Sequence, residues 1–341
     1  MSYKIAIMKG DGIGPEISQV AESVINTIAK KNNIEINIQN VQGGDSSLSK
    51  NGIALPEETI ALIKESDACL KGPVGESAMD VIVKLRQMFD LYVNLRPIVN
   101  LPNIKSIETG IDLMIVRENT EDLYAGMEFK INEGAIALKK TTKKNCERII
   151  DYAFKVAMNR NKKLVAVHKS NVLRLTDGLF SEIAKEYSVK YPEVEFSEMY
   201  VDACAMNLIR NPKDFDVIVT TNLYGDILSD EAAQIIGGLG ISPSANIGNS
   251  FAIFEPVHGA APDISGKGIA NPFSIILSVK MMLTWLGEKN KDEKLKNAAN
   301  SIDKSIINTL EKKIMTPDLG GSNTTKEVGK ELIDNIINQY E

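Results

Sequence analysis

The sequence predicts an α/β protein of two domains built on a largely parallel sheet. Short apolar runs of strand length alternate with longer stretches of helical periodicity, which is the pattern of strands joined by crossover helices. The chain has 341 residues, and a typical domain has about 150. No linker rich in Pro, Gly or Ser divides the sequence. We therefore expect the chain to cross between the domains more than once.

Strands and helices alternate from the N-terminus. Residues 4–8 form a short apolar run that predicts a strand, and glycines follow it. Pro15 opens a helical stretch, because proline is favoured at the first helical position, where its missing N–H costs nothing. Isoleucines alternate with polar residues over 34–38, which predicts a half-buried strand. Pro56 opens another helix, and residues 67–71 return to a strand.

The alternation continues towards the C-terminus. Apolar runs predict further strands over 111–118, 163–168 and 216–221. Helical periodicity predicts helices near 142–160, 177–187, 224–236, 271–287, 291–312 and 325–339. Segment 124–140 alternates weakly and predicts a hairpin, which is either an arm that pairs with another subunit or an ordinary surface hairpin.

Composition excludes several classes of protein. The net charge of −6 and the pI near 5.3 disfavour binding to nucleic acid or to an anionic membrane. The cysteines are Cys69, Cys146 and Cys204, without a C-x-x-C pair, which argues against a disulfide framework. Since the histidines are only His168 and His258, a common tetrahedral zinc site cannot be assembled locally. Any metal is therefore expected to be a hard cation held by carboxylates.

Neither a signal peptide nor a membrane span is predicted. The N-terminal residues run directly into a strand and a turn, without the apolar region of a signal peptide. The apolar stretch 275–286 is too short to span a bilayer and contains Lys280. We expect a cytoplasmic protein.

Two glycine-rich loops are candidates for close approach to a ligand. GDGIGPE at 10–16 has the spacing G-x-G-x-G, in which the third glycine comes one position earlier than in the dinucleotide motif G-x-G-x-x-G. It is therefore either a variant nucleotide loop or a tight strand-to-helix turn. The loop 254–272, FEPVHGAAPDISGKGIANP, combines Pro, Gly and Ala before a predicted helix, although loops of this composition are common.

Three arginines are candidates for binding carboxylates, because the guanidinium group offers a rigid two-pronged fork. Arg86 lies on a predicted helix, whereas Arg96 and Arg117 lie at predicted strand edges. Ligand crevices form at strand ends in α/β sheets. The alternative is that each arginine is a solvated surface residue.

A set of aspartates is a candidate metal site. Asp226 and Asp230 are four positions apart and share one helix face, where a divalent cation would turn their repulsion into attraction. Asp202 is the third candidate, and the alternative is a solvated acidic face.

Lys169 follows a buried strand and is a candidate general base, because desolvation can lower the pKa of a lysine. We interpret the neighbouring His168 as structural.

Taken together, these motifs resemble one family, the β-decarboxylating dehydrogenases of metal-bound 2-hydroxy acids. The family includes isopropylmalate, isocitrate and homoisocitrate dehydrogenases. The matching motifs, in the family's order along nearly the whole chain, are GDGIGPE, LRQMFDLYVNLRP, VRENTEDLYAG, HKSNVLRLTDGLF, DACAMNLIRNP, NLYGDILSDEAA and EPVHGAAPDISGKGIANP. The segment KGPVGESAMDVIVKLRQ is most similar to the archaeal isopropylmalate dehydrogenases of this family.

The resemblance implies the isopropylmalate-dehydrogenase-like fold, with a mixed, mostly parallel central sheet that is not a true Rossmann fold. Residues 1–98 and 240–341 would form the first, cofactor-binding domain. Residues 99–239 would form the second domain, with the dimer interface and an arm at about 124–140. The partners implied are a small 2-hydroxy acid and a second copy of the chain, in a homodimer with composite active sites.

The resemblance also assigns roles to site residues. The substrate carboxylates would be bound by Arg86, Arg96 and Arg117. Mg²⁺ or Mn²⁺ would be held by Asp226 and Asp230, with Asp202, which also contacts the substrate, supplied by the other subunit. Lys169, also from the other subunit, would assist proton transfer, and Tyr124 would be the general acid. A non-catalytic regulatory subunit would be expected to lack some of these residues, and all are present.

The implied cofactor is NAD. Its binding would involve Glu255, His258, Gly259, Ala260, Asp263, Ile264 and Asn271. The carboxylate of Asp263 favours NAD over NADP, because it can accept hydrogen bonds from the ribose hydroxyls and repels a 2′-phosphate.

The implied reaction is the oxidative decarboxylation of 3-isopropylmalate to 4-methyl-2-oxopentanoate in leucine biosynthesis. Ile82 and Val83 would form an apolar wall for the isopropyl group, whereas isocitrate enzymes carry Ser and Asn at the positions of Asp80 and Ile82. Homoisocitrate enzymes tend to have a polar or basic residue near Val83. Bacterial isopropylmalate enzymes usually carry a Glu where this chain has Met79. Isocitrate and homoisocitrate therefore stay open as alternative substrates.

Overall fold

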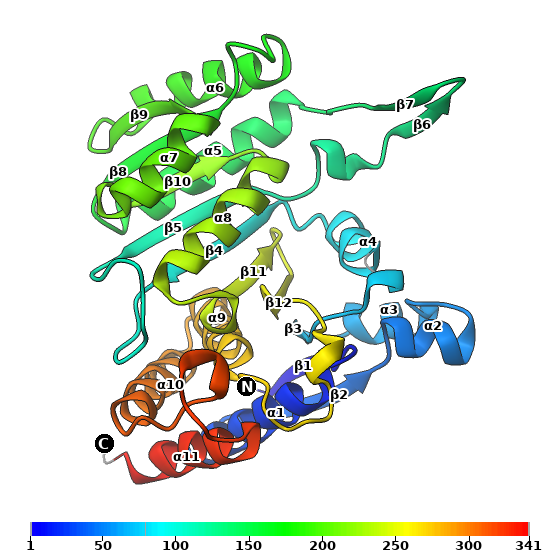
Figure 1. The fold of residues 1–341 in the computed structure, drawn as a ribbon, viewed down its shortest axis with the longest axis vertical. Helices are drawn as coiled ribbons and strands as arrows, with labels where there is room; N and C mark the ends of the chain where they lie inside the picture. The colour runs from blue at the N-terminus through cyan, green and yellow to red at the C-terminus, as the bar shows by residue number, and fades with distance from the viewer. Residues whose placement is uncertain (1, 79, 340–341) are drawn as a thin grey trace.

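A computed structural model describes residues 2–78 and 80–339, and Met79 lies outside the described residues (Figure 1). One ten-stranded sheet runs through the molecule in the order β2-β1-β3-β12-β11-β4-β5-β10-β8-β9. Its strands are β1 (Ser2–Met8), β2 (Glu35–Val41), β3 (Ala68–Lys71), β4 (Val93–Val99), β5 (Asp112–Glu118), β8 (Lys163–His168), β9 (Glu195–Tyr200), β10 (Val217–Thr220), β11 (Pro243–Ile247) and β12 (Ala252–Pro256). Within this sheet, as far as the described residues form it, the pairs β11–β12, β11–β4 and β4–β5 are antiparallel and the others are parallel. The predicted mixed, mostly parallel sheet is confirmed.

Helices cover both faces of the sheet. They are α1 (Gly14–Lys31), α2 (Asp45–Asn51), α3 (Glu57–Lys64), α4 (Asp80–Met88), α5 (Lys143–Met158), α6 (Thr176–Lys190), α7 (Val201–Arg210), α8 (Asn222–Ile236), α9 (Phe273–Asn290), α10 (Glu293–Glu311) and α11 (Thr325–Asn338). Alternate residues of β1 face opposite cores, as the period of a strand requires. Ile5 and Ile7 pack with α1 and α9, whereas Ala6 and Met8 pack with α3 and α4.

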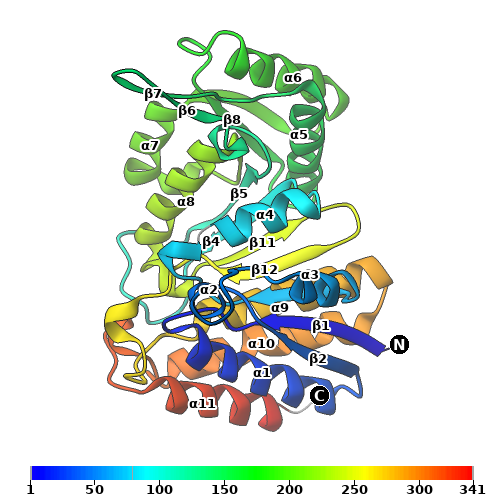
Figure 2. The same cartoon turned by 90° about the vertical axis from the view of Figure 1, so that its right-hand side faces the viewer.

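The other half of the sheet carries its own helices. In Figures 1 and 2, α5 and α6 cover one face of β5, β10, β8 and β9, and α7 and α8 cover the opposite face. The hairpin of β6 (Glu128–Ile131) and β7 (Gly134–Ala137) projects away from this half, and its residues are all exposed. The predicted hairpin is confirmed, and its pairing with another subunit stays a prediction.

Both chain ends lie in the half that contains α1 and α11 (Figure 1). The chain passes to the other half through β4 and β5 and returns through α8 and β11. The domain boundaries at 98/99 and 239/240 stay a prediction. Within the described residues, no helix combines the length and the apolar composition needed to cross a bilayer.

The GDGIGPE segment forms the turn between β1 and α1. Gly12 has φ of +56°, and a Cβ there would lie 1.9 Å from the carbonyl oxygen of Ala260. The Asp11 carboxylate accepts backbone N–H bonds from Asp45 and Ser46 at the start of α2 and from Gly75 in the loop after β3, so it joins this turn to both. Close packing of the backbone therefore explains the glycine at position 12 of the GDGIGPE segment.

Candidate active site

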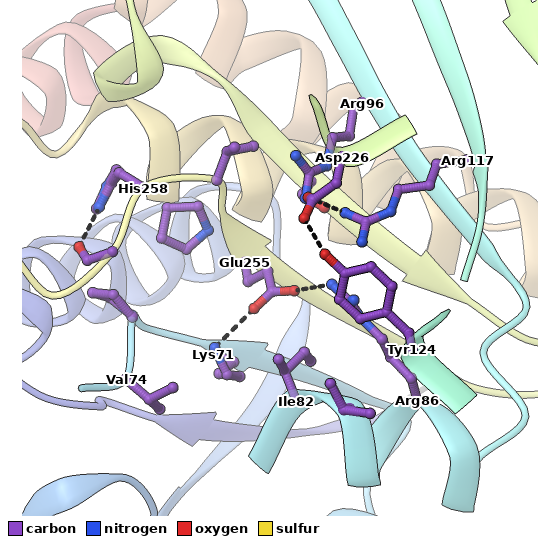
Figure 3. A pocket seen from close by; sticks show the side chains of 16 residues that line it. Lys71, Val74, Ile82, Arg86, Arg96, Arg117, Tyr124, Asp226, Glu255 and His258 are labelled. Atoms are coloured by element: carbon purple, nitrogen blue, oxygen red, sulfur yellow. Dashed lines mark hydrogen bonds and ion pairs between the residues drawn. The ribbon is translucent and has the colours of Figure 1, made fainter. Parts of the chain in front are cut away.

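A cavity of about 250 Å³ lies between the two halves of the molecule and gathers the predicted substrate residues. Figure 3 shows that their side chains converge from five elements. They are Arg86 on α4, Arg96 on β4, Arg117 on β5, Tyr124 in the short helix η2 (Leu123–Ala125) and Asp226 on α8. Residues that are up to 140 positions apart in sequence therefore form one charged pocket.

The three arginines are buried, with exposures of 6%, 7% and 1% for Arg86, Arg96 and Arg117. The alternative that they are solvated surface residues is wrong. The prediction that Arg96 lies at a strand edge is also wrong, because it occupies the middle of β4. Burial lowers the pKa of Arg117 to about 9, and the nearby Arg96 and Arg86 contribute. The group still carries its charge at pH 7.

Asp226 lies at the centre of this cluster. Its Oδ1 accepts hydrogen bonds from Arg117 Nη1 and from Arg96 Nη2, the latter at 3.1 Å, and its Oδ2 accepts one from the Tyr124 hydroxyl. Burial alone would raise the pKa of the Asp226 carboxyl, but Arg117 and Arg96 lower it below its usual value. Burial and the bond to Asp226 raise the pKa of Tyr124. The carboxylate is therefore charged, and the phenol keeps its proton at neutral pH.

Asp230 lies one helical turn after Asp226 and accepts a hydrogen bond of 3.0 Å from Arg96 Nη1. Burial raises the pKa of its carboxyl. The glycine before Asp226 has a packing role, because a Cβ on Gly225 would lie 2.5 Å from Cγ of Arg117. A side chain at Gly225 would push Arg117 out of the cluster.

A buried ion pair that sequence reasoning missed lies next to the arginines. Lys71 Nζ donates to Glu255 Oε2 at 2.8 Å, and Arg86 Nη2 lies 3.5 Å from Oε1 of the same carboxylate (Figure 3). Burial would raise the pKa of Glu255, but Lys71 and Arg86 lower it to about 2. The signal that could have revealed Lys71 is a charge at the end of an otherwise apolar predicted strand.

Part of the pocket lining is apolar. Ile82 and Val83 on α4 and Val74 in the loop before α4 line it, and Figure 3 shows the side chains of Ile82 and Val74. Both residues of the predicted apolar wall, Ile82 and Val83, therefore line the cavity.

The comparisons with known proteins agree with this geometry. A profile described as "Isocitrate/isopropylmalate dehydrogenase" matches residues 4–332. A "3-isopropylmalate dehydrogenase" of Saccharolobus solfataricus is 50% identical to this chain, covering 97% of it and 99% of that protein. A "Homoisocitrate dehydrogenase" of Methanocaldococcus jannaschii is 46% identical, covering 98% of this chain and 97% of that protein. The crystal structure of isocitrate dehydrogenase from Methylococcus capsulatus matches with a TM-score of 0.89 at 39% identity, covering 98% and 99% of the two chains. The chain belongs to the isocitrate/isopropylmalate dehydrogenase family. It is a decarboxylating dehydrogenase of that family.

The predicted cofactor loop of this dehydrogenase borders a second cavity, of about 630 Å³. Its lining includes His258, Gly259, Ile264 and Asn271 from the predicted set. His258 Nδ1 lies 3.0 Å from the carbonyl oxygen of Gly259 and so must donate to it, which leaves the buried Nε2 as an acceptor without a partner among the described residues. Burial lowers the pKa of His258, so the ring is neutral.

The other residues of the predicted cofactor set, and Asn271, have contacts elsewhere in the fold or are exposed. Ala260 accepts the N–H of Ile13 through its carbonyl, and Asp263 is exposed on the short helix η5 (Pro262–Ile264). Asn271 donates to Asp318 at 2.9 Å and caps the start of α9 by accepting the N–H of Phe273. Glu255 faces the substrate pocket rather than the second cavity.

Lys169 and Asp202 lie outside the pocket and form a pair of their own. Lys169 Nζ lies 2.5 Å from Asp202 Oδ1, and this bond lowers the pKa of the Asp202 carboxyl. Lys169 also has a fixed backbone, because its N–H donates to the buried Asp177 at 2.7 Å. The neighbouring His168 is buried and bonded to Glu198 at 3.0 Å, in line with its structural interpretation.

Asp226 and Asp230 suit a hard divalent cation, because both offer carboxylate oxygens from one helix face next to Arg96. Within residues 2–78 and 80–339, no group of three Asp, Glu, His or Cys side chains could hold a metal ion.

Proposed function

We propose that this protein catalyses the NAD- and metal-dependent oxidative decarboxylation of 3-isopropylmalate. The observation that carries the proposal is the lining of the pocket, which combines three buried arginines with the apolar side chains of Ile82 and Val83. The arginines match a malate core with two carboxylates. The apolar wall matches an isopropyl group, whose three carbons contribute roughly 2 kcal/mol on burial.

The arginines would orient the substrate and stabilise its carboxylates. Asp226 and Asp230 would hold Mg²⁺ or Mn²⁺, with Asp202 of the partner subunit completing the ligand set. The metal, when bound, would supply Lewis-acid stabilisation of negative charge on the substrate oxygen. Tyr124, whose raised pKa keeps its proton on the hydroxyl, would protonate carbon after CO₂ leaves.

NAD would bind along the loop 255–271. The unpartnered Nε2 of His258 supports an adenine at the second cavity, since the exocyclic amino group of adenine can donate to it. The size of this cavity, about 630 Å³, is typical of cofactor sites. Asp263 would accept hydrogen bonds from the ribose hydroxyls.

The active form would be a homodimer with composite sites. Exposed apolar side chains on α7 and α8 support an interface there, namely Met206 (66%), Ile209 (64%) and Ile227 (58%). Ile227 follows Asp226 directly, and Asp202 lies in the first turn of α7. An interface over these helices would bring Lys169 and Asp202 of one subunit close to Asp226 of the other.

The deciding experiment is the measurement of kcat/KM for 3-isopropylmalate, isocitrate and homoisocitrate with NAD and Mg²⁺. We expect isopropylmalate to have the highest value. An equal or higher value for either tricarboxylic acid would refute the apolar-wall argument and assign that acid as the substrate.

A further inference from the structure

We propose that three buried asparagines, Asn94, Asn222 and Asn246, are positioning residues that each hold one substrate arginine through an uncharged acceptor. The inference rests on the proposed function in taking a dicarboxylate as the ligand of these arginines. Each asparagine fixes the Nε edge of one guanidinium group and leaves its net charge intact for the substrate.

The same contact occurs three times. Arg96 Nε donates to Asn94 Oδ1 at 2.8 Å. Arg86 Nε donates to Asn246 Oδ1 at 2.9 Å. Arg117 donates to Asn222 Oδ1 twice, from Nε at 2.9 Å and from Nη2 at 2.7 Å. Arginines on three different elements are therefore held by the same type of hydrogen bond, from Nε to an asparagine Oδ1.

The asparagines are themselves fixed, and each is 0% exposed. Asn222 Nδ2 donates to the carbonyl of Glu121 at 3.1 Å. Asn94 Nδ2 donates to Ser244 Oγ at 2.7 Å, and Asn246 Nδ2 donates to Glu255 Oε1 at 2.8 Å. Because each amide nitrogen has an acceptor, each amide oxygen must face its arginine.

A direct link joins two of the anchors. Asn94 Nδ2 lies 3.1 Å from Asn246 Oδ1, so Arg86 and Arg96 are held by one connected pair of amides. Asn119, which follows β5, also donates to Asn246 Oδ1 at 3.0 Å. The network thus spans α4, β4, β11 and the end of β5, the elements that meet at the pocket.

An amide rather than a carboxylate at these positions has an electrostatic consequence. Lys71 and the three arginines already face the carboxylates of Asp226, Asp230 and Glu255. Without the metal ion, that arrangement has a surplus of one positive charge, which a carboxylate in place of any one asparagine would cancel. The surplus attracts the dianionic acid, and the low dielectric of the buried site strengthens the effect.

The test compares two substitutions at one anchor. Asn222→Asp keeps an acceptor for Arg117 and adds charge at the first position of α8, where the helix dipole favours a carboxylate. We expect KM for the acid to rise about tenfold with KM for NAD unchanged. Asn222→Ala keeps the arginine's charge but removes its anchor, and we expect kcat/KM to fall about 100-fold with a reduced kcat.

The matched control is Asn335, whose exposure is 7% and whose Nδ2 donates to Thr309 at 2.9 Å between α10 and α11. Asn335→Ala should lower the unfolding temperature and leave both KM values at wild-type levels. If the Asn222 variants do not fold, Asn94→Ser tests the same idea at Arg96 and should also lower kcat/KM.

The kinetics use whichever of 3-isopropylmalate, isocitrate, homoisocitrate and malate the wild-type enzyme oxidises best. Failure of the proposed substrate would show in the wild-type enzyme, whereas failure of this inference would show only in the variants. Folded Asn222→Asp and Asn222→Ala variants with wild-type kcat and KM would overturn it. Loss of stability without a change in either KM, as in the control, would equally reduce the asparagines to packing residues.

Discussion

The charged groups in the pocket and the Lys169–Asp202 pair are both candidates for the same chemistry, yet they are held in opposite ways. Arg117 is 1% exposed and bonded to both Asp226 and Asn222. In the exposed pair, 68% of the Asp202 side chain is accessible. The pocket is thus preorganised by the folding of one chain. An exposed ion pair contributes little stability and does not fix its own geometry, so the fold of one chain preorganises Lys169 and Asp202 less than it does the pocket.

Removing a pocket arginine should have the largest effect on activity. Arg117→Met is expected to lower kcat/KM by about 10³-fold, or about 4 kcal/mol, because it removes charge stabilisation at the substrate. Stability should fall by about 1–3 kcal/mol, because Asp226 loses one of its two arginines and the buried Asn222 Oδ1 loses its donor. Steady-state kinetics and thermal unfolding measure the two effects. A stable variant with wild-type kcat/KM would remove Arg117 from the site.

Lys71→Met should destabilise the fold by about 3 kcal/mol, because it leaves the buried Glu255 carboxylate without its main partner. Lys169→Met is the matched control in the exposed pair and should change the free energy of unfolding by less than about 1 kcal/mol. Urea unfolding at pH 7 measures both variants. Equal changes in the free energy of unfolding in the two variants would contradict the expected difference between the buried and the exposed ion pair.

The buried Lys71–Glu255 pair predicts that the stability of the fold depends on pH. The folded-state pKa of Glu255 is about 2, and an unfolded glutamate has a pKa of about 4.3. Its contribution to stability is therefore complete above the unfolded value and is lost as pH falls from there towards 2. Between these two pH values, the free energy of unfolding should fall more steeply with decreasing pH in the wild type than in Glu255→Gln. Parallel curves would contradict the assignment.

Subunit mixing tests whether the two regions meet across an interface. Lys169→Ala and Asp226→Ala should each be nearly inactive, and a heterodimer should contain one site with both lesions and one with neither. Random exchange of equal amounts makes about half of the dimers mixed, so about a quarter of wild-type activity should return. Mass spectrometry would verify the heterodimers. Verified heterodimers without activity would exclude a composite site.

The sequence predicted the elements better than it predicted the contacts. Helices such as α8 and α9 were predicted to within three residues, because each is a long segment rich in buried apolar residues. The helix α7 was missed, although it carries Asp202. This helix is short and follows β9 directly, so no turn in the sequence marks where it begins.

For the site, the residue types were predictable and the partners were not. Arg86, Arg96 and Arg117 were chosen as candidates for carboxylate chemistry, and all three line one pocket. The Lys71–Glu255 pair joins residues 184 positions apart, and its members have no common motif. Likewise, Asn246 is an ordinary residue in the sequence, and only the register of β11 against β4 brings it to Asn94.

Asp263 gives the smallest predicted effect. It tests whether an exposed carboxylate can act in binding without a residue from a second subunit. Like Asp202, it is an exposed carboxylate, but it lies beside the second cavity of its own chain and needs no partner subunit. It should accept hydrogen bonds from the ribose hydroxyls of NAD and repel a 2′-phosphate. We expect kcat/KM for NAD to exceed that for NADP by about tenfold, or about 1.4 kcal/mol. Asp263→Ser should reduce this ratio by raising the value for NADP, and Asp303→Ser, at a half-buried position on α10, should leave it unchanged. Wild-type kcat/KM that is equal or higher with NADP would refute the role of Asp263, while leaving the pocket arginines untouched.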